Sequence, residues 1–358
     1  MARNSSYSFL YLLFSPLIWI TSKVYSILPT TDILIIVEAL EYMFNNLQVF
    51  LFSLVGYDLK FISYDHGSVL ITGASSAIGG SVAIQLAEQG YTVFAGVNAL
   101  PDAHRLKTFI SPKNHHRLIP LLLDVTNQNH IQHAVQTVLH NFSQAPERER
   151  QLVGIINCVG MPFDGPLETI SAQDWTHILQ VNTVGPFAVI SAFMDLLRES
   201  RGRVINLSSA NTMIASPIHG VYSASKQALE NATHTLRNEV FRFGISVSLI
   251  IYGAVDTSSN FSRPIVETKR NSTNFTPKQE TLYKPLVKSV SIIDKETKEH
   301  TVEASVATRA IVHALTSETP KSRYLVGIDS KLTRLFGWVF SDRVLDLAYQ
   351  VLVNQSAQ

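Results

Sequence analysis

The chain has 358 residues, enough for one large α/β domain with extensions at its ends. Its formal net charge is +1 and no basic block stands out, which argues against a nucleic-acid-binding surface. The single cysteine, Cys158, excludes an intrachain disulfide and favours a reducing compartment. Apolar residues make up 46% of the chain and charged residues only 16%, and most of the apolar excess lies near the N-terminus.

Two apolar stretches form that N-terminal excess. Residues 4–22 carry no charge and are bracketed by Arg3 and Lys23, and a second stretch covers residues 33–57. The first has about the length that a helix needs to cross a bilayer. Three interpretations are open: membrane-spanning or re-entrant helices, helices lying in the headgroup layer, and a helical subdomain packed on the main fold. We expect residues 1–60 to form a membrane-associated region.

From His66 onward, strand-like and helix-like patterns alternate. Continuous apolar runs separated by helical segments are typical of a parallel sheet that is buried on both faces. The expected strands cover residues 68–72, 91–97, 118–123, 152–157, 202–208 and 245–251. The expected helices cover residues 81–90, 130–142, 171–199 and 222–243. The pattern predicts a doubly wound α/β domain over residues 66–330, with the ligand site at the carboxyl ends of the strands.

A hydroxyl, a phenol and an ammonium group follow the fifth expected strand. Ser209 lies thirteen residues before Tyr222, and Lys226 lies four residues after it. If Tyr222 opens a helix, Lys226 shares its face, and a cation there favours the phenolate. We therefore expect a lowered pKa for Tyr222, suited to proton exchange with an alcohol or ketone. The alternative is an ordinary amphipathic helix that happens to carry a Tyr and a Lys.

The turn after the first expected strand, residues 72–79, is suited to a dinucleotide. Backbone N–H groups and a helix N-terminus would meet the pyrophosphate there. Gly73 permits the tight turn, and Gly79 permits close approach of the helix to the strand. A glycine-containing turn by itself is weak evidence for a dinucleotide site. The position of this turn directly after the first strand strengthens that evidence.

Polar residues at other strand ends are further candidates. Asp124 follows the third strand, where it would accept from an adenine amino group or cap the next helix. Gly160, after the fourth strand, leaves room for a flat ring to lie on the backbone. Asn182 sits inside the expected helix 171–199, an unfavourable place for Asn, and indicates a kink or a water-binding role.

In this order and at these intervals, the motifs resemble those of the short-chain dehydrogenase/reductase family over about residues 66–330. The motifs are Thr72-Gly73 with Gly79, Asp124-Val125, Asn157 with Gly160, Asn182, Ser209, Tyr222 with Lys226, and Gly253 with Thr257. Val93–Val97 and Arg323–Asp329 resemble the branch that holds retinol, hydroxysteroid and 3-hydroxybutyrate dehydrogenases.

The resemblance implies hydride transfer between a nicotinamide cofactor and a carbonyl or secondary alcohol carbon. Tyr222 would be the general acid or base, and Lys226 would lower its pKa and hold the nicotinamide ribose. Ser209 would orient the substrate oxygen, and Asn182 would hold a water in the proton relay. No metal is expected. The implied cofactor contacts are Gly73, Ser75, Ser76, Ile78, Gly79, Asn98, Asp124, Val125, Asn157, Gly160, Tyr222, Lys226, Gly253, Val255 and Thr257.

Three departures from the family pattern concern the cofactor site. Ala77 replaces the usual middle glycine of the turn, Cys158 and Val159 replace Asn-Ala, and Tyr252 replaces the proline before Gly253. None removes a catalytic group. They support an alternative function, a catalytically weak or inactive member that serves as a membrane-tethered scaffold or cofactor sensor.

Cofactor choice depends on the end of the second strand. A carboxylate there would accept from the ribose hydroxyls of NAD, whereas Val97 and Asn98 occupy that place. Its absence favours NADP over NAD. Residues 258–300 are polar and lose the strand–helix rhythm, and the resemblance implies a loop that folds over the substrate.

Residues 331–358 predict a C-terminal amphipathic helix with a wide apolar stripe. It would pack on the core or on a subunit neighbour in a homo-oligomer, or contact a membrane and line an apolar substrate entrance. With the N-terminal runs, it favours a lipophilic substrate such as a sterol, retinoid or long-chain keto lipid. We expect association with the endoplasmic reticulum or another intracellular membrane, with the catalytic domain facing the cytosol.

Overall fold

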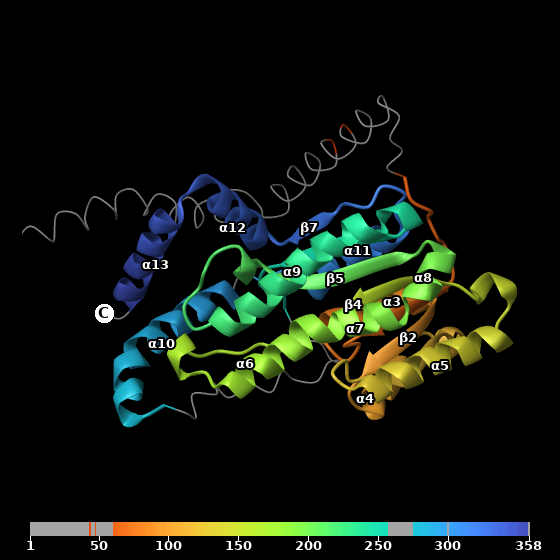
Figure 1. Cartoon of the computed structure of the whole chain (residues 1–358), viewed down its shortest axis with the longest axis horizontal. Helices are drawn as coiled ribbons and strands as arrows, with labels where there is room; N and C mark the ends of the chain where they lie inside the picture. Colours follow the sequence, from red (N-terminus) through yellow and green to blue (C-terminus); the bar gives the residue numbers. More distant parts are fainter. Residues whose placement is uncertain (1–42, 44–46, 48–59, 257–274, 299–300, 357–358) are drawn as a thin grey trace, which may run out of the picture.

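The computed structural model describes residues 60–256, 275–298 and 301–356, together with Met43 and Leu47. These residues form a seven-stranded parallel sheet in the order β3-β2-β1-β4-β5-β6-β7, with helices on both faces (Figure 1). The predicted doubly wound fold is therefore confirmed. The N-terminal runs 4–22 and 33–57 lie outside the described residues, Met43 and Leu47 excepted.

The strands lie within two residues of the predicted ranges, and β7 follows the six predicted ones. The strands are β1 (Ser68–Thr72), β2 (Thr92–Val97), β3 (Leu118–Leu122), β4 (Leu152–Asn157), β5 (Arg203–Ser209), β6 (Ser246–Tyr252) and β7 (Arg323–Val326). The helices are α3 (Ala77–Glu88), α4 (Leu100–Lys107), α5 (Gln128–Gln144), α6 (Ala172–Leu179), α7 (Gly185–Ala192), α8 (Met194–Ser200), α9 (Gly220–Val240), α10 (Pro277–Lys298), α11 (Ala304–Thr316), α12 (Ile328–Val339) and α13 (Asp342–Ser356).

Two apolar clusters fill the space on either side of the sheet. Side chains of α3, α4 and α11 pack on one face, and side chains of α5, α7 and α8 pack on the other. The central strands β1, β4 and β5 are fully buried along their length. A parallel sheet covered in this way brings its strand ends, and the loops that follow them, to one edge.

Three predicted elements differ from the structure. The helix predicted over 171–199 is divided into α6, α7 and α8, with a π-helical turn at Gln180–Val184 between α6 and α7. The predicted loop 258–300 contains the 22-residue helix α10. The predicted C-terminal helix is two helices, α12 and α13, with a break at Phe340 and Ser341.

Within the described residues, no single helix has the length and apolar character to span a bilayer. The pair formed by residues 172–192 and 194–200, bent by 58°, meets that test by length and composition alone.

A row of buried polar side chains crosses the sheet below the strand ends. The Thr72 hydroxyl donates to Asn157 Oδ1 (3.2 Å), and Asn157 Nδ2 donates to Asn206 Oδ1 (2.8 Å). Asn206 Nδ2 then donates to the Thr233 hydroxyl (2.9 Å) on α9. These side chains are at most 1% exposed, so water cannot reach them. Each hydrogen bond in the row therefore satisfies a polar group that would otherwise be buried without a partner. The row ties β1, β4, β5 and α9 together.

Replacing the central member of this row tests its contribution to stability. Asn206→Leu leaves the buried Asn157 amide without its acceptor, and we expect the free energy of unfolding to fall by about 1–3 kcal/mol or more. Urea unfolding of the full chain in detergent measures it. Asn129→Leu, at an exposed position of α5, is the control, with an expected change of at most about 0.5 kcal/mol. Equal stability of the two variants would contradict the assignment.

Candidate active site

A cavity of about 830 Å³ opens at the carboxyl ends of the strands. Its walls come from the N-terminus of α3, the segments after β4, β5 and β6, and the helices α9, α12 and α13. Several predicted site residues lie together in this wall. They are Ser76, Ile78, Gly160, Ser209, Tyr222, Gly253 and Val255.

The glycine turn between β1 and α3 forms one wall. Gly73 has a φ of +66°, and an added Cβ would lie 3.0 Å from the Val159 backbone nitrogen. An added Cβ at Gly79 would lie 2.3 Å from the Gly73 carbonyl oxygen, so this position accepts only glycine. The Ser76 side chain caps α3 by accepting from the Gly79 N–H (3.1 Å). The turn therefore presents a helix N-terminus to the cavity, an arrangement that fits a pyrophosphate.

Ala77, a departure from the family pattern, begins α3 at this turn. It lines the cavity and is only 4% exposed, so its methyl group adds little to the open surface of the wall. Ser75 is half-buried at the same turn. The geometry of the turn is thus compatible with a dinucleotide despite the extra methyl group.

The Tyr222 phenol lines the same cavity as this turn. Tyr222 is on the first turn of α9, as predicted, and it lines the cavity together with Tyr252 and Ser209. Ser209 ends β5 and is 7% exposed, and its hydroxyl also accepts from the Asn211 N–H (3.3 Å). The structure therefore brings together the predicted Ser209 and Tyr222, and adds Tyr252.

The prediction that Lys226 lowers the pKa of Tyr222 is wrong for this arrangement. Burial raises the pKa of the Tyr222 phenol above its ordinary value, and the nearby polar side chains of Tyr252 and Ser209 only partly oppose that effect. Lys226 Nζ instead donates to the carbonyl oxygens of Leu207 (3.1 Å) and Val159 (3.3 Å). A phenol with a raised pKa is protonated at neutral pH, which suits a general acid.

Lys226 is a buried cation, with only 1% of its surface exposed. Burial lowers its pKa to about 8, while Cys158 and Glu230 act in the opposite direction. Gly160 lies directly against it, because an added Cβ would be 3.1 Å from Nζ. The space that we predicted for a flat ring above Gly160 is therefore partly taken by the Lys226 ammonium group.

Asn182 lies in the π-helical turn between α6 and α7, so the regular α-helix is interrupted at this residue. Its Oδ1 accepts from the Met161 N–H (2.7 Å), and its Nδ2 donates to the Met161 carbonyl (3.0 Å) and the Ser225 hydroxyl (2.9 Å). The side chain is fully buried and is not part of the cavity wall. Its contacts fix the segment after β4 against α9, and do not support the predicted water-binding role of this side chain.

The remaining predicted cofactor residues differ in their surroundings. Asp124 accepts from the Thr126 N–H (2.9 Å) and hydroxyl (2.7 Å), while Asn127 caps α5, so the alternative of Asp124 as the cap is wrong. Val125 is a buried core residue. Asn157 belongs to the buried polar row, and Asn98 is exposed directly after β2. Thr257 lies outside the described residues.

Several polar residues of the wall were not predicted, among them His219, Asp164 and Asp329. His219 Nδ1 lies 2.8 Å from Asp164 Oδ1, beside the start of α9. Asp329 accepts from the Ala254 N–H and fills the space beside Gly253, and burial raises its pKa. Asp329 belongs to a motif that predicted no chemical role for it, and no spacing rule joins Asp164 to His219, 55 residues apart.

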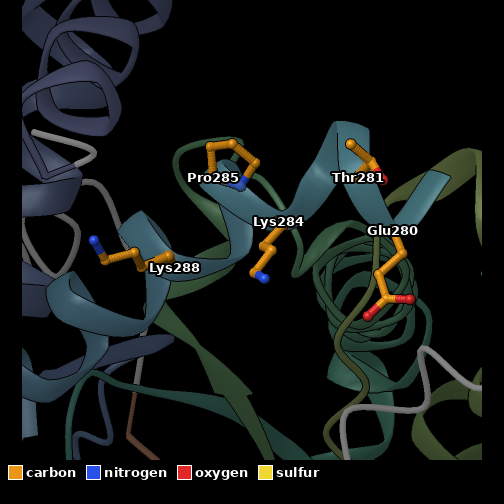
Figure 2. A pocket seen from close by; sticks show the side chains of 5 residues that line it. All are labelled: Glu280, Thr281, Lys284, Pro285 and Lys288. Atoms are coloured by element: carbon orange, nitrogen blue, oxygen red, sulfur yellow. The ribbon is translucent and has the colours of Figure 1, made fainter. Parts of the chain in front are cut away.

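A second, smaller cavity lies on α10. It has a volume of about 390 Å³ and is lined by Glu280, Thr281, Lys284, Pro285 and Lys288. Figure 2 shows these side chains spread along one helix, with Glu280 and Lys284 turned to one side and Thr281 and Pro285 to the other. All five are exposed. This hollow is separate from the cavity at the strand ends and contains none of the predicted catalytic groups.

Gly79→Ala tests the turn. The added methyl group would collide with the Gly73 carbonyl, and we expect the dissociation constant for NADPH to rise about tenfold or more as the turn opens. Fluorescence of bound NADPH measures it. Gly165→Ala is the control because an added Cβ there meets only ordinary contacts at 3.6 Å. Unchanged affinity in Gly79→Ala would refute this placement of the pyrophosphate.

Lys226→Met tests the buried cation. Between its pKa of about 8 in the folded chain and 10.5 in the unfolded chain, only the unfolded chain binds the proton, so stability rises with pH in this window. We expect the free energy of unfolding of wild type to rise by about 2 kcal/mol relative to that of Lys226→Met between about pH 7 and about pH 10. Urea unfolding without dinucleotide measures both proteins. If the free energies of unfolding of wild type and Lys226→Met changed with pH in parallel, Lys226 would have an ordinary pKa in the folded chain.

Comparison with known proteins agrees with this geometry. The family model described as short chain dehydrogenase matches residues 68–266. The chain is 31% identical over 268 residues to 17-beta-hydroxysteroid dehydrogenase type 6 of Rattus norvegicus, covering 74% of this chain and 81% of that protein. It is 29% identical to retinol dehydrogenase 5 of Mus musculus, covering 81% and 90%.

A solved structure shows the same fold. It is a short chain dehydrogenase from Burkholderia cenocepacia in complex with NADP, with a TM-score of 0.56 and 19% identity, covering 80% of this chain and 98% of that one. Sequence motifs, sheet order, glycine turn and phenol site thus agree with one another. The chain belongs to the short-chain dehydrogenase family, NAD(P)-dependent oxidoreductases that act on CH–OH groups.

Proposed function

We propose that this enzyme transfers hydride between NADP(H) and the carbonyl or secondary alcohol carbon of a lipophilic substrate at a membrane. The observation that carries the proposal is that the glycine turn of α3 and the Ser209–Tyr222 pair line one cavity. Bound there, the nicotinamide would supply or accept the hydride. The chain itself would supply the binding groups, the proton and the shape of the site.

The proton transfer follows from the Tyr222 surroundings. In reduction, the Tyr222 phenol donates its proton to the substrate oxygen while the carbonyl carbon receives the hydride. Ser209, which lines the cavity beside this phenol, would orient that oxygen. In oxidation the proton returns to Tyr222. A raised phenol pKa keeps Tyr222 protonated, which is the form that the acid role in reduction requires.

Cofactor binding is assigned to the turn and to the strand ends. The backbone N–H of Ile78 would meet the pyrophosphate at the N-terminus of α3, whereas the Ser76 N–H already donates to the Gly73 carbonyl (3.0 Å). Asn98, exposed directly after β2, offers no carboxylate to the ribose, which favours NADP. The solved Burkholderia cenocepacia enzyme of the same fold is a complex with NADP, which supports this preference. Asp124 and Lys226 stay predicted contacts of the adenine and the ribose.

The substrate class is inferred from the walls and the relatives. Leu207, Ile214 and Val255 give the cavity apolar surface, and Thr333 of α12 and Tyr349 of α13 close it. The Tyr349 hydroxyl hydrogen-bonds Ser216 (2.8 Å), which ties α13 to the cavity rim. The two named relatives are a hydroxysteroid and a retinol dehydrogenase. A steroid, retinoid or similar keto lipid is therefore the proposed substrate.

Membrane association is proposed from both ends of the chain. On α12, Leu335, Trp338 and Val339 are exposed, and Trp338 is 83% exposed, which is unusual for a soluble surface. An apolar helical face beside a lipid-binding cavity suits contact with a bilayer. The uncharged stretch 4–22 suits an anchor. The departures Ala77, Val159 and Tyr252 leave the Ser209–Tyr222 pair in place, so the described residues give the scaffold alternative no specific support.

Tyr222→Phe tests the proposed chemistry. The variant lacks the transferable proton, so we expect turnover of keto steroids and retinal with NADPH to fall by ~10²-fold or more. Its affinity for NADPH should persist because the glycine turn is unchanged. The assay uses the full chain in detergent and follows NADPH absorbance. Tyr91→Phe, which removes a buried phenol hydroxyl in the core, is the control. Turnover by Tyr222→Phe equal to that of wild type would end the assignment.

A further inference from the structure

A third cavity lies at the amino ends of the strands, away from the proposed active site. It has a volume of about 560 Å³ and forms where the end of α8, the turn after α9 and the segment before β1 meet. Among the described residues that line it, four are cationic, none is acidic and three are phenylalanines. The four cations are Lys60, Arg198, Arg201 and Arg242.

The segment that leads into β1 is fastened to this edge of the sheet. The Phe61 N–H donates to the Glu318 carbonyl (2.8 Å). Arg203 Nη2 donates to the Ile62 carbonyl (2.6 Å), and its guanidinium carbon lies 5.5 Å from the centre of the Phe61 ring. These contacts fix the backbone directly after Lys60, so the place where the chain enters the domain is set.

The chain before Lys60 is apolar almost up to this wall. Residues 42–57 carry no charge and belong to the second N-terminal stretch, for which the sequence predicts membrane association. Only Asp58 and Leu59 separate this stretch from Lys60. Three residues span at most about 11 Å even when fully extended. A bilayer that holds residues 42–57 must therefore lie close to the cavity.

Two arginines of the wall share one aromatic ring. The guanidinium carbons of Arg198 and Arg242 lie 5.3 and 4.9 Å from the centre of the Phe243 ring. Arg198 also pairs with the exposed Asp195 (2.6 Å). Because arginines already occupy Phe243, the ring does not favour a choline cation. An anion in the cavity would instead offset the repulsion between the two guanidinium groups.

The third arginine is held by an unfavourable backbone conformation. Arg201 ends α8 with a φ of +51° and a ψ of +43°, a left-handed conformation that favours glycine. Its side chain crosses Gly244, where an added Cβ would lie 3.1 Å from Arg201 Cδ. The chain thus keeps a cation in this wall at a position where glycine would be easier to accommodate, and such outliers cluster at functional sites.

Stabilisation of helix ends explains only part of this arrangement. Cations at a helix C-terminus offset the helix dipole, and this role would account for Arg198 and Arg201 without a ligand. It does not account for Lys60, which lies in no helix, or for a hollow that all four cations line.

We propose that this cavity binds the phosphate group of an anionic phospholipid at the bilayer surface. This inference rests on the membrane association in the proposed function. Each Lys or Arg close to an anionic bilayer strengthens binding, and Lys60, Arg201 and Arg242 contribute here together with Arg198. Figure 1 shows the start of the described chain and α12 along the same upper rim of the molecule, so one flat bilayer can meet both.

A competition between two lipids tests the site. The full chain in a neutral detergent is mixed with equal amounts of phosphatidylserine and phosphatidylcholine, and native mass spectrometry counts the lipid that stays bound. We expect wild type to retain phosphatidylserine preferentially. The double variant Arg201→Gln with Arg242→Gln should retain about tenfold less of it. Equal retention of the two lipids by wild type would overturn the proposal.

The control variant loses the same net charge elsewhere. Lys113→Gln with Arg309→Gln changes two exposed residues outside the cavity and should retain as much phosphatidylserine as wild type. Equal retention by the two double variants would refute the site. Urea unfolding checks that the variants fold. If the arginine variant unfolds more easily than wild type, Lys60→Gln with Arg242→Gln, which spares the left-handed residue, takes its place.

Glycerol phosphate separates a lipid from a soluble phosphate. It carries the same phosphate group without acyl chains, and we expect it to leave phosphatidylserine bound when added at the concentration of the lipid. Displacement at that concentration would show that the cavity takes a soluble phosphate, which would overturn the assignment to a phospholipid.

Failure of this site and failure of the proposed function give different results. If wild type reduces a keto steroid or retinal with NADPH while both double variants retain equal lipid, the site is lost and the function stands. If wild type selects phosphatidylserine through Arg201 and Arg242 yet shows no turnover with NADPH, the proposed hydride transfer is lost and the site stands.

Discussion

The Tyr222 phenol on α9 meets Ser209 and Tyr252, the last residues of β5 and β6, in the wall of one cavity. The rest of the site depends on this junction, because the phenol must face both a bound dinucleotide and a substrate oxygen. Two features hold it. Strand register places Ser209 beside Tyr252, and the buried polar row from Thr72 to Thr233 ties α9 to the sheet below.

Burial decides the electrostatics of this site more than charge pairing does. The same desolvation that raises the pKa of Tyr222 lowers that of Lys226 to about 8, so both groups are shifted towards their neutral forms. A site built in this way suits an apolar substrate, because closing it expels little water from charged groups.

Sequence patterns predicted the sheet well because its strands are continuous apolar runs, and the site residues at strand ends followed from that topology. Lys226 shows where such reasoning stops, since spacing on a helix fixes the face of a residue and not the direction of a four-carbon side chain. The helix α10 was missed because its composition is polar and Pro285 lies inside it. Pairs such as Asp164 with His219, and Asn206 with Thr233, depend on tertiary contacts that no local pattern encodes.

The most direct test of the account follows the hydride itself. NADPH carrying deuterium at the transferred position of nicotinamide C4 is mixed with the full chain in detergent and a keto steroid or retinal, and the product is analysed by mass spectrometry. The account predicts one deuterium on the carbon that bears the new hydroxyl, with one oxidised cofactor formed per product. Product without deuterium at that carbon, or no product from any keto steroid or retinoid although NADPH binds, would contradict it.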